Sequence, residues 1–358
     1  MSTPLFDLSF YCDRRVLITG HTGFKGGWLC KILVNAGADI LGYSRGSEKN
    51  PSLFELSGVK SQIRHIRGDI RDYIYLNQIF REFQPEIVFH LAAQPIVRES
   101  YIDPRYTYET NLMGTVNLLD CIRNAPSVKS AVIVTTDKVY KNHEWPWGYR
   151  ENETLNGFDP YSNSKSCAEL AVDSYRNSFF NASGVPVSTV RAGNVLGGGD
   201  FAKDRVIPDC IKAIQKRESI LIRNPYSIRP YQHVLDPLFA YLMIARKQFD
   251  NPGLAGAYNI GPDERDCLTT GELVDLFCQK WGEGANWESR AEKNAPHENQ
   301  FLKLDCSLIK QVFDWKPRWH IEYCVELVCK FYKLWLTGED ISQEMDREIR
   351  EFLKGDLY

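Results

Sequence analysis

The sequence has no apolar run that approaches the roughly 20 residues needed to cross a bilayer. Its N-terminal segment also lacks the basic start and the long apolar stretch of a secretory signal. An excess of charge of one sign is missing as well, because 43 Lys and Arg stand against 46 Asp and Glu, for a formal net charge of −3. We therefore expect a cytoplasmic protein with no nucleic-acid or membrane partner.

The ten cysteines lack the CxxC pairs and the Cys/His spacings that are typical of zinc sites. We therefore predict no metal site. Most of the cysteines stand in apolar segments, as Cys30, Cys121 and Cys324 do, where a free thiol packs like a small hydrophobic side chain. Reduced thiols are the state expected in the cytoplasm.

Short β-branched runs alternate with longer amphipathic ones over residues 1–192. This alternation predicts a doubly wound parallel sheet, an α/β fold of the Rossmann-like class. The predicted strands are 16–19, 40–41, 63–67, 86–91, 130–135 and 187–191, and the main helices are 27–36, 111–123 and 161–180.

The regular alternation of predicted strands and helices ends after residue 192. A length of 358 residues exceeds the usual single-core domain, and we predict a dinucleotide-binding domain over 1–192 and a smaller substrate-binding C-terminal lobe over 193–358. We expect residues 230–262 to return to the first domain. The predicted elements of this half are a strand at 220–222, helices at 236–246 and 270–281, and one last amphipathic helix after a turn at 316–319.

A glycine-rich stretch, Thr19-Gly20-His-Thr-Gly23-Phe-Lys-Gly26, lies between the first predicted strand and the first predicted helix. Glycines there permit a tight turn and a close approach of a diphosphate, while the helix N-terminus offers free N–H groups. We predict that this loop binds a dinucleotide cofactor through Gly20, Thr22, Gly23, Phe24, Lys25 and Gly26.

The end of the second strand reads Gly42-Tyr43-Ser44-Arg45 and carries no acid. An acid at this point would bind the ribose 2′-hydroxyl of NAD, whereas Arg45 could bind the 2′-phosphate of NADP or be a solvated charge. The residues alone leave this choice open. Further predicted cofactor contacts at strand ends are Asp69, whose other interpretation is a turn or cap, Ile70, Leu91, Ala92, Ala93 and Thr135.

Tyr161 and Lys165 are four residues apart on a predicted helix and therefore share one face. A tyrosine with a pKa near 10 is a poor base, and a nearby ammonium together with a positive nicotinamide would favour its phenolate. Thr136 stands at the carboxyl end of a strand, where ligands bind in such sheets. The three residues, with the glycine-rich loop, predict a hydride-transferring site to which Tyr161 and Lys165 also contribute cofactor contacts.

These features resemble the extended short-chain dehydrogenase/reductase superfamily and, within it, the nucleotide-sugar 4,6-dehydratases, most closely those that act on CDP-glucose. The resemblance spans nearly the whole chain and implies a CDP-hexose substrate, NAD as cofactor and a homodimer or homotetramer formed through the helices at 111–123 and 161–180. The matching stretches include Gly20–Trp28, Phe89–Pro95, Trp147–Glu153, Asp159–Lys165, Val190–Val195, Gly197–Asp200, Ile222–Pro225, Ile228–Pro230, Lys303–Cys306 and Trp315–Trp319.

The resemblance also implies a division of roles in catalysis. Tyr161, with Lys165 and Thr136, would take the proton of the sugar 4-hydroxyl while C4 is oxidised. Lys138 would then remove the C5 proton and Asp137 would protonate the departing 6-hydroxyl, before hydride returns to C6. The sequence Asp137-Lys138 is typical of CDP-glucose enzymes and of some UDP-N-acetylglucosamine dehydratases, whereas dTDP-glucose enzymes carry Asp-Glu, so Lys138 narrows the substrate without fixing it. The competing interpretation is a structural ion pair at a strand end.

Substrate contacts are expected mainly in the second lobe, where arginine forks suit phosphate. Each arginine could instead be a surface charge, and packing is an equally good role for Gln94 and Tyr231. His90 is expected to be a buried structural histidine. The predicted substrate-binding residues are Gln94, Asn194, Arg205, Arg223, Arg229, Tyr231, His297 and Glu298.

The favoured hypothesis is a lyase that makes a CDP-4-keto-6-deoxyhexose, which would feed deoxysugars into surface polysaccharide such as lipopolysaccharide O-antigen. Two alternatives remain open. The first is an epimerase, or a dehydratase of another nucleotide sugar, with the same fold. The second is a cofactor-sensing scaffold without activity, against which the complete set of five catalytic residues argues.

Overall fold

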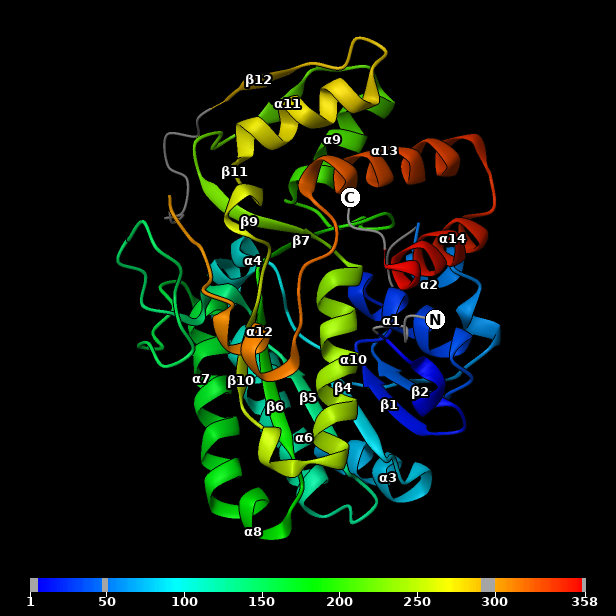
Figure 1. Ribbon diagram of the computed structural model, residues 1–358, viewed down its shortest axis with the longest axis vertical. Coiled ribbons are helices and arrows are strands. Elements are labelled where there is room, and N and C mark those ends of the chain that lie inside the picture. The colour runs from blue at the N-terminus through cyan, green and yellow to red at the C-terminus, as the bar shows by residue number, and fades with distance from the viewer. Residues whose placement is uncertain (1–5, 47–50, 291–299, 356–358) are drawn as a thin grey trace.

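The computed structural model describes residues 6–46, 51–290 and 300–355. Its centre is a seven-stranded sheet with the order β10-β6-β5-β4-β1-β2-β3 and only parallel pairs (Figure 1). This arrangement confirms the predicted fold class. The strands are β1 (Arg15–Thr19), β2 (Asp39–Ser44), β3 (Arg64–Arg67), β4 (Ile87–His90), β5 (Ser130–Val134), β6 (Val187–Ala192) and β10 (Ala257–Ile260).

The inner strands are buried on both faces, which explains their continuous apolar sequences. Val16, Leu17 and Ile18 of β1 are all fully buried. The edge strand β3 is largely exposed instead, and its arginines discourage pairing with another sheet. Strand order reverses between β1 and β4, so the crevice at their carboxyl ends is the place where this fold binds ligands.

Helices cover both faces of the sheet (Figure 1). A core cluster on one face includes residues of α3 (Tyr73–Phe83), α6 (Gly114–Arg123) and α7 (Pro160–Tyr175). The other face packs against α1 (Phe24–Asn35) and α10 (Leu235–Asp250). Turns of π-helix precede α6 and follow α7. Shorter helices are α2 (Leu53–Leu56), α4 (Val97–Ile102), α5 (Pro104–Tyr108) and α8 (Asn181–Ser183).

A smaller lobe lies beyond the carboxyl ends of the sheet, at the top of Figure 1. Its strands form a three-stranded sheet in the order β11-β9-β7 and a two-stranded sheet of β12 and β8. The elements of this lobe are β7 (Asn194–Leu196), α9 (Val206–Lys216), β8 (Ile220–Ile222), β9 (Ile228–His233), β11 (Cys267–Thr269), α11 (Thr270–Trp281), β12 (Trp287–Ser289) and α13 (Ile321–Thr337). Helix α12 (Ser307–Phe313) packs on β10 of the large sheet, and α14 (Ile341–Lys354) contacts both α13 and α1.

The prediction of one last amphipathic helix was wrong, because two helices follow the turn at 316–319. Gly338, with φ of +79°, ends α13, and the Asp340 side chain caps α14 by accepting from Gln343 N. Before these two helices, the chain returns to the large sheet at α10 and β10. Helix α10 packs beside β5, and β10 pairs with β6.

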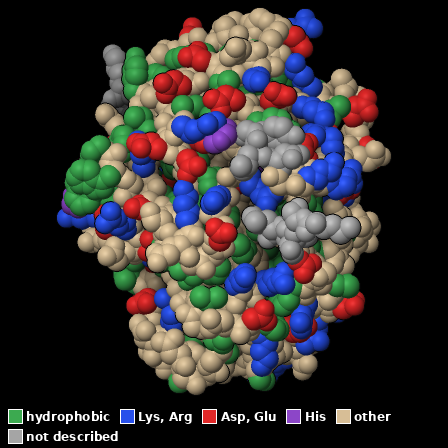
Figure 2. Space-filling view, viewed as in Figure 1, with side chains coloured by type: hydrophobic (Ala, Val, Ile, Leu, Met, Phe, Trp, Pro, Cys, Tyr) green, Lys and Arg blue, Asp and Glu red, His purple; other side chains and the backbone are tan. Residues whose placement is uncertain are grey.

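The surface is mixed in charge, and Figure 2 shows Lys and Arg interspersed with Asp and Glu over one face. No helix in the described part of the chain is long and apolar enough to span a membrane. All ten cysteines are free thiols, and six of them are buried.

Candidate active site

The glycine-rich loop has the geometry of a diphosphate cradle. Gly20 has φ of +75°, and a Cβ there would lie 2.7 Å from the backbone nitrogen of Ala92. A Cβ on Gly26 would lie 2.7 Å from the Cα of His21, so both positions require glycine. Gly23 begins α1 without a side-chain cap, and a Cβ there would meet only one atom, at 3.3 Å. The free N–H groups of this helix start therefore face open space that suits an anion.

A long groove runs from this loop along the carboxyl ends of the strands, and every residue predicted to bind the cofactor lines it. The groove combines the uncapped N-terminus of α1 with the carboxyl ends of strands on both sides. This arrangement fits a nicotinamide dinucleotide. The groove also contains residues that the sequence did not single out, among them Tyr43 and Gly68. Gly68 must be small, because a Cβ there would lie 2.5 Å from the Tyr43 hydroxyl. The others are Ser44, Gly46, Pro95, Thr110 and Val134.

Tyr161 lies in the first turn of α7, where the Asp159 side chain caps the helix by accepting from Ser162 N. Burial raises the pKa of Tyr161 to about 12, and a hydrogen bond with Thr136 and the charge of Arg205 only partly oppose this. Burial also lowers the pKa of Lys165 to about 8, and its ammonium donates to the Val134 carbonyl at 3.1 Å. Burial therefore dominates among the protein groups, and the expectation that Lys165 and a positive nicotinamide together favour the phenolate stays a prediction.

Asp137 and Lys138 form a close ion pair directly after Thr136. Lys138 Nζ lies 2.8 Å from Asp137 Oδ1, which also accepts from the Thr136 hydroxyl at 3.0 Å. The Asp137 side chain is 1% exposed, and its Oδ2 has no hydrogen-bond partner among the described residues. Lys138 also donates to Asn194 Oδ1 at 3.3 Å. A buried carboxyl and an amine thus stand beside the Thr136–Tyr161 pair, the combination that acid–base chemistry requires.

The sequence model of GDP-mannose 4,6 dehydratase matches residues 17–328. The chain belongs to this dehydratase family. A curated relative, the CDP-glucose 4,6-dehydratase of Salmonella typhimurium, is 46% identical over 355 residues, which cover 98% of this chain and 99% of the relative. The resemblance to the extended short-chain dehydrogenases/reductases is thereby confirmed.

Two solved structures share the fold of this chain. UDP-glucose 4-epimerase of Thermus thermophilus, in complex with NAD, is 25% identical with a TM-score of 0.77, covering 89% of this chain and 99% of that one. dTDP-glucose 4,6-dehydratase of Bacillus anthracis, also in complex with NAD, is 20% identical with a TM-score of 0.75, covering 89% and 96%.

A buried polar network lies next to Lys165 on α7. Glu169, one helical turn after Lys165, is 2.8 Å from the Arg191 guanidinium and accepts from Thr189 at 2.7 Å and from Thr135. Its charge raises the pKa of Lys165 and so opposes the effect of burial. Sequence reasoning missed Glu169, although its position four residues beyond Lys165 on the same helix was a readable signal.

Two of the predicted substrate residues lie at this site. Arg205 lines the groove, is held by Asp200 at 2.8 Å, and its charge acts on Tyr161. Asn194 contacts Lys138. Lys25 belongs to the same cationic group, since burial and Arg205 lower its pKa to about 7 and its amine donates to the Tyr241 hydroxyl at 3.3 Å.

The remaining substrate predictions lie farther out or carry internal contacts. Arg223 pairs with Asp204 at 2.9 Å, whereas Arg229 and Tyr231 are buried in β9. The Gln94 amide donates to Thr107 at 3.0 Å and accepts from Ile96 N at 2.6 Å, the contacts of a structural residue. His297 and Glu298 lie outside the described residues.

His90 has the surroundings of a structural histidine. Its ring nitrogens bond the hydroxyls of Thr19 at 2.7 Å and Thr115 at 3.1 Å, and burial lowers its pKa to about 3. Side-chain hydroxyls, rather than backbone groups, satisfy the ring. No group of three or more His, Cys, Asp or Glu side chains with the arrangement of a metal site occurs in the described ranges.

Proposed function

We propose that this enzyme is a hydro-lyase that converts CDP-glucose to CDP-4-keto-6-deoxyglucose and water. One observation carries the proposal: the buried Asp137 and its partly exposed partner Lys138 stand directly beside Thr136 and Tyr161, so an elimination site adjoins a hydride-transfer site. The 46% identity to a CDP-glucose 4,6-dehydratase over nearly the full length supports the choice of sugar nucleotide.

The proposed cofactor is NAD, because the groove fits a dinucleotide and two similar structures hold NAD. NAD supplies a hydride acceptor that becomes a hydride donor within the same cycle. The glycine-rich loop would hold its diphosphate, and Leu91, Ala92 and Ala93 leave room along the strand end for it. Thr135, Ile70 and Asp69 would line the remainder of the groove.

Tyr161 is proposed to take the proton of the sugar 4-hydroxyl as C4 is oxidised. Thr136 bonds the phenol, and the charge of Arg205 favours the phenolate that the base requires. The ammonium of Lys165 and the positive nicotinamide would add to this effect. Because burial outweighs these groups and the pKa of Tyr161 stays at about 12, the phenolate depends on further positive charge brought next to it. The new 4-ketone then acidifies the hydrogen on C5.

The Asp137–Lys138 pair is proposed to carry out the elimination. One proton passed across their 2.8 Å contact converts an ion pair into a neutral carboxylic acid and a neutral amine, with no change in total charge. The neutral Lys138 amine can then accept the C5 proton, while the acid donates its proton to the departing 6-hydroxyl. The structural ion pair and the catalytic pair are therefore two protonation states of one site.

We also propose how the enzyme holds its substrate and assembles. Arg205 and Asn194 would bind the diphosphate near the reacting sugar, with Arg223, Arg229, Tyr231 and Gln94 as outer contacts. A homodimer or a homotetramer through α6 and α7 is supported by large apolar side chains exposed on or beside these helices. They are Met113 at 48%, Leu170 at 56% and Phe179 at 39% exposure. We place the enzyme in the cytoplasm.

The decisive assay offers the purified protein CDP-, dTDP-, UDP- and GDP-hexoses with NAD and without reductant. We expect CDP-glucose alone to give efficient loss of 18 mass units, the mass of one water. A product of unchanged mass would favour an epimerase, and loss of water from another sugar nucleotide would reassign the substrate. No conversion of any sugar would favour the scaffold.

A further inference from the structure

The loop over residues 197–205 joins two residues of the candidate site. Asn194 lies in β7 before the loop, and Arg205 ends the loop directly before α9. An arginine side chain has many rotamers, so a guanidinium on a loose loop would have no fixed place. The contacts of this loop therefore decide where the charge of Arg205 lies.

The first half of the loop is held between α1 and α13. The Trp28 indole of α1 donates to the Gly198 carbonyl at 3.0 Å. A Cβ on Gly198 would overlap the Phe331 ring of α13, so the chain passes this helix at a distance that only glycine allows. The helix that begins at the glycine-rich cofactor loop thus also supports the loop that carries Arg205.

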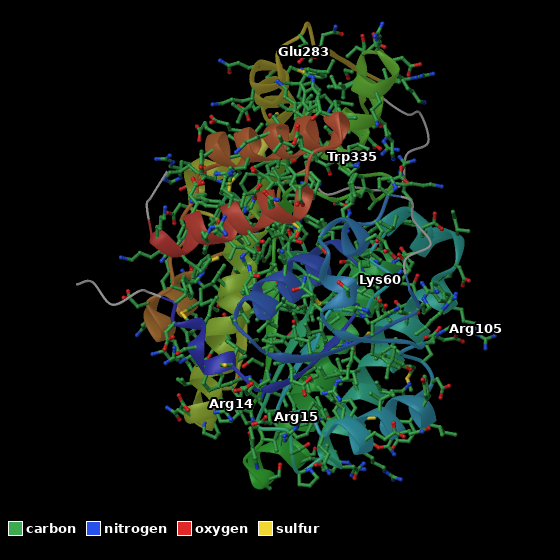
Figure 3. The ribbon with its side chains drawn as sticks, turned by 90° about the vertical axis from the view of Figure 1, so that its right-hand side faces the viewer. Arg14, Arg15, Lys60, Arg105, Glu283 and Trp335 are labelled. Carbon is green, nitrogen blue, oxygen red and sulfur yellow. The ribbon has the colours of Figure 1, made fainter. Side chains whose placement is uncertain are left out.

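Helix α13 holds the main chain at Asp200 as well. The Tyr332 hydroxyl donates to the Asp200 carbonyl at 2.5 Å. The ring of the next residue, Phe201, packs against Tyr332 and Trp335 with centres 5.9 and 5.1 Å away. Trp335, labelled in Figure 3, lies in the last turn of α13. The backbone of Asp200 therefore has a fixed position.

The Asp200 carboxylate bonds two donors. Its Oδ2 accepts from Arg205 Nη1 at 2.8 Å, and its Oδ1 accepts from Ala202 N at 3.0 Å. The Asp200 side chain is 8% exposed, whereas the Arg205 side chain is 36% exposed and lines the groove. A buried carboxylate on a fixed backbone thus anchors a guanidinium that the groove can reach.

The charge of Arg205 acts at the catalytic tyrosine. Burial and the charges of Asp137 and Asp159 raise the pKa of Tyr161, and the charge of Arg205 opposes them. Lys25 is a further cation beside Arg205, since burial and the charge of Arg205 lower its pKa. The place of the guanidinium therefore matters for the proposed base, and it also matters for a phosphate in the groove.

We propose that Asp200 is a positioning residue that holds the Arg205 guanidinium where it serves both the substrate diphosphate and Tyr161. The inference rests on the proposed function and deepens the role that Arg205 has there. Asp200 acts through its acceptor oxygens. A carboxylate that only screened Arg205 would have the opposite effect, because its removal would strengthen the binding of an anion.

The first measurement is a calorimetric titration of the full chain, saturated with NAD, with CDP. Arg205→Met should weaken CDP binding about tenfold, the effect of one charge-assisted hydrogen bond. Asp200→Ala should weaken it at least about fivefold, because binding must then order the guanidinium. Asp200→Asn should bind CDP within about twofold of the wild type, since its amide oxygen can still accept from Arg205.

Two further readouts separate positioning from a general loss of structure. In the Arg205→Met background, Asp200→Ala should change the CDP affinity by less than about twofold, because no guanidinium remains to be held. With CDP-glucose, the acid limb of kcat/KM against pH should move to higher pH by up to about one unit in Asp200→Ala and in Arg205→Met. A phenol without the nearby cation deprotonates only at higher pH. Asp200→Asn should show no such upward shift.

Asp346→Ala is the matched control for destabilisation. The Asp346 carboxylate lies 3.0 Å from Lys31 Nζ, where α14 packs on α1 and outside the groove. This variant should lower the melting temperature, as Asp200→Ala does, and leave CDP binding unchanged. If Asp200→Ala does not fold, Asp200→Ser takes its place, because a serine hydroxyl can still accept from Ala202 N but is too short to reach Arg205.

Several outcomes would overturn the positioning role. They are unchanged or tighter CDP binding in Asp200→Ala, an equal loss in Asp200→Ala and Asp200→Asn, and a loss that persists in full in the Arg205→Met background. A wild type that binds CDP but releases no water from CDP-glucose overturns the proposed function, while the binding series still decides the role of Asp200. If UDP binds in place of CDP, the base assignment fails and UDP serves in the same series. A wild type that binds neither nucleotide overturns both proposals.

Discussion

The Glu169→Gln variant probes the buried network next to Lys165. Glu169 is 3% exposed, and its carboxylate is 2.8 Å from the guanidinium of Arg191, which is also 3% exposed. Glutamine has almost the same shape, but it carries no charge and offers one acceptor oxygen in place of two. The change therefore leaves a buried guanidinium uncompensated and one of the hydroxyls of Thr135 and Thr189 without its acceptor.

The loss of stability can be estimated from that geometry. Breaking a buried ion pair by removing one partner costs about 3–5 kcal/mol. At roughly 2 °C per kcal/mol, the value for large domains, the melting temperature should fall by about 6–10 °C. Circular dichroism against temperature measures this fall.

The variant should also change the pH dependence of catalysis. The Glu169 charge raises the pKa of Lys165, which burial lowers to about 8. Without that charge the pKa of Lys165 falls further, so the ammonium that supports the Tyr161 phenolate is lost at a lower pH. The alkaline limb of kcat/KM against pH should therefore move to lower pH.

A control separates this effect from destabilisation. Ser188 is buried on the same strand as Arg191, and its hydroxyl donates to Gln248 Oε1 at 2.5 Å, not to Glu169 or Arg191. Ser188→Ala should lower the melting temperature and leave the pH profile in place. An unchanged melting temperature and an unchanged alkaline limb in Glu169→Gln would refute the reasoning.

Three further predictions concern single positions. Lys138→Ala should still exchange hydride at C4 but lose exchange of the C5 proton with solvent, as NMR in deuterium oxide can show; normal C5 exchange would remove Lys138 from the elimination. Because the pKa of Lys165 is about 8 in the folded state and 10.5 in an unperturbed lysine, the folded state binds fewer protons than the unfolded state between these two pH values. The free energy of unfolding should therefore rise between about pH 8 and pH 10.5, by up to about 3 kcal/mol more in the wild type than in Lys165→Met. Urea unfolding midpoints measured at several pH values would show this difference. Gly26→Ala should weaken NAD binding at least about tenfold, because its Cβ would lie 2.7 Å from backbone, whereas Gly253→Ala, with its nearest neighbour at 3.2 Å, should not.

The large sheet was predictable because its inner strands are apolar on both faces and bounded by turns. Other elements depend on tertiary pairing. Strand β9 contains Pro230, which argues against a strand in isolation, yet it pairs on both sides within the small lobe. Strand β10 has four residues, and only its pairing with β6 gives it a place in the sheet. In α14, the side chains of Ile341, Met345 and Ile349 form a buried stripe with helical spacing. This pattern was visible in the sequence, but only one helix was predicted where the structure has α13 and α14.

The residues of the site were predictable where neighbouring strand ends bring them together, as with Thr136 after β5 and the glycine-rich loop after β1. The pKa of Tyr161 was not, because burial depends on the packing of both lobes around it.

The central claim is that one site moves hydrogen among three adjacent carbons of a sugar. CDP-glucose carrying deuterium at C4, incubated with the protein and NAD in ordinary water, tests this claim most directly. We expect a 4-keto-6-deoxy product that carries the deuterium on C6 and a solvent proton on C5. A product without deuterium at C6, or an isomer of unchanged mass that keeps deuterium on C4, would contradict it.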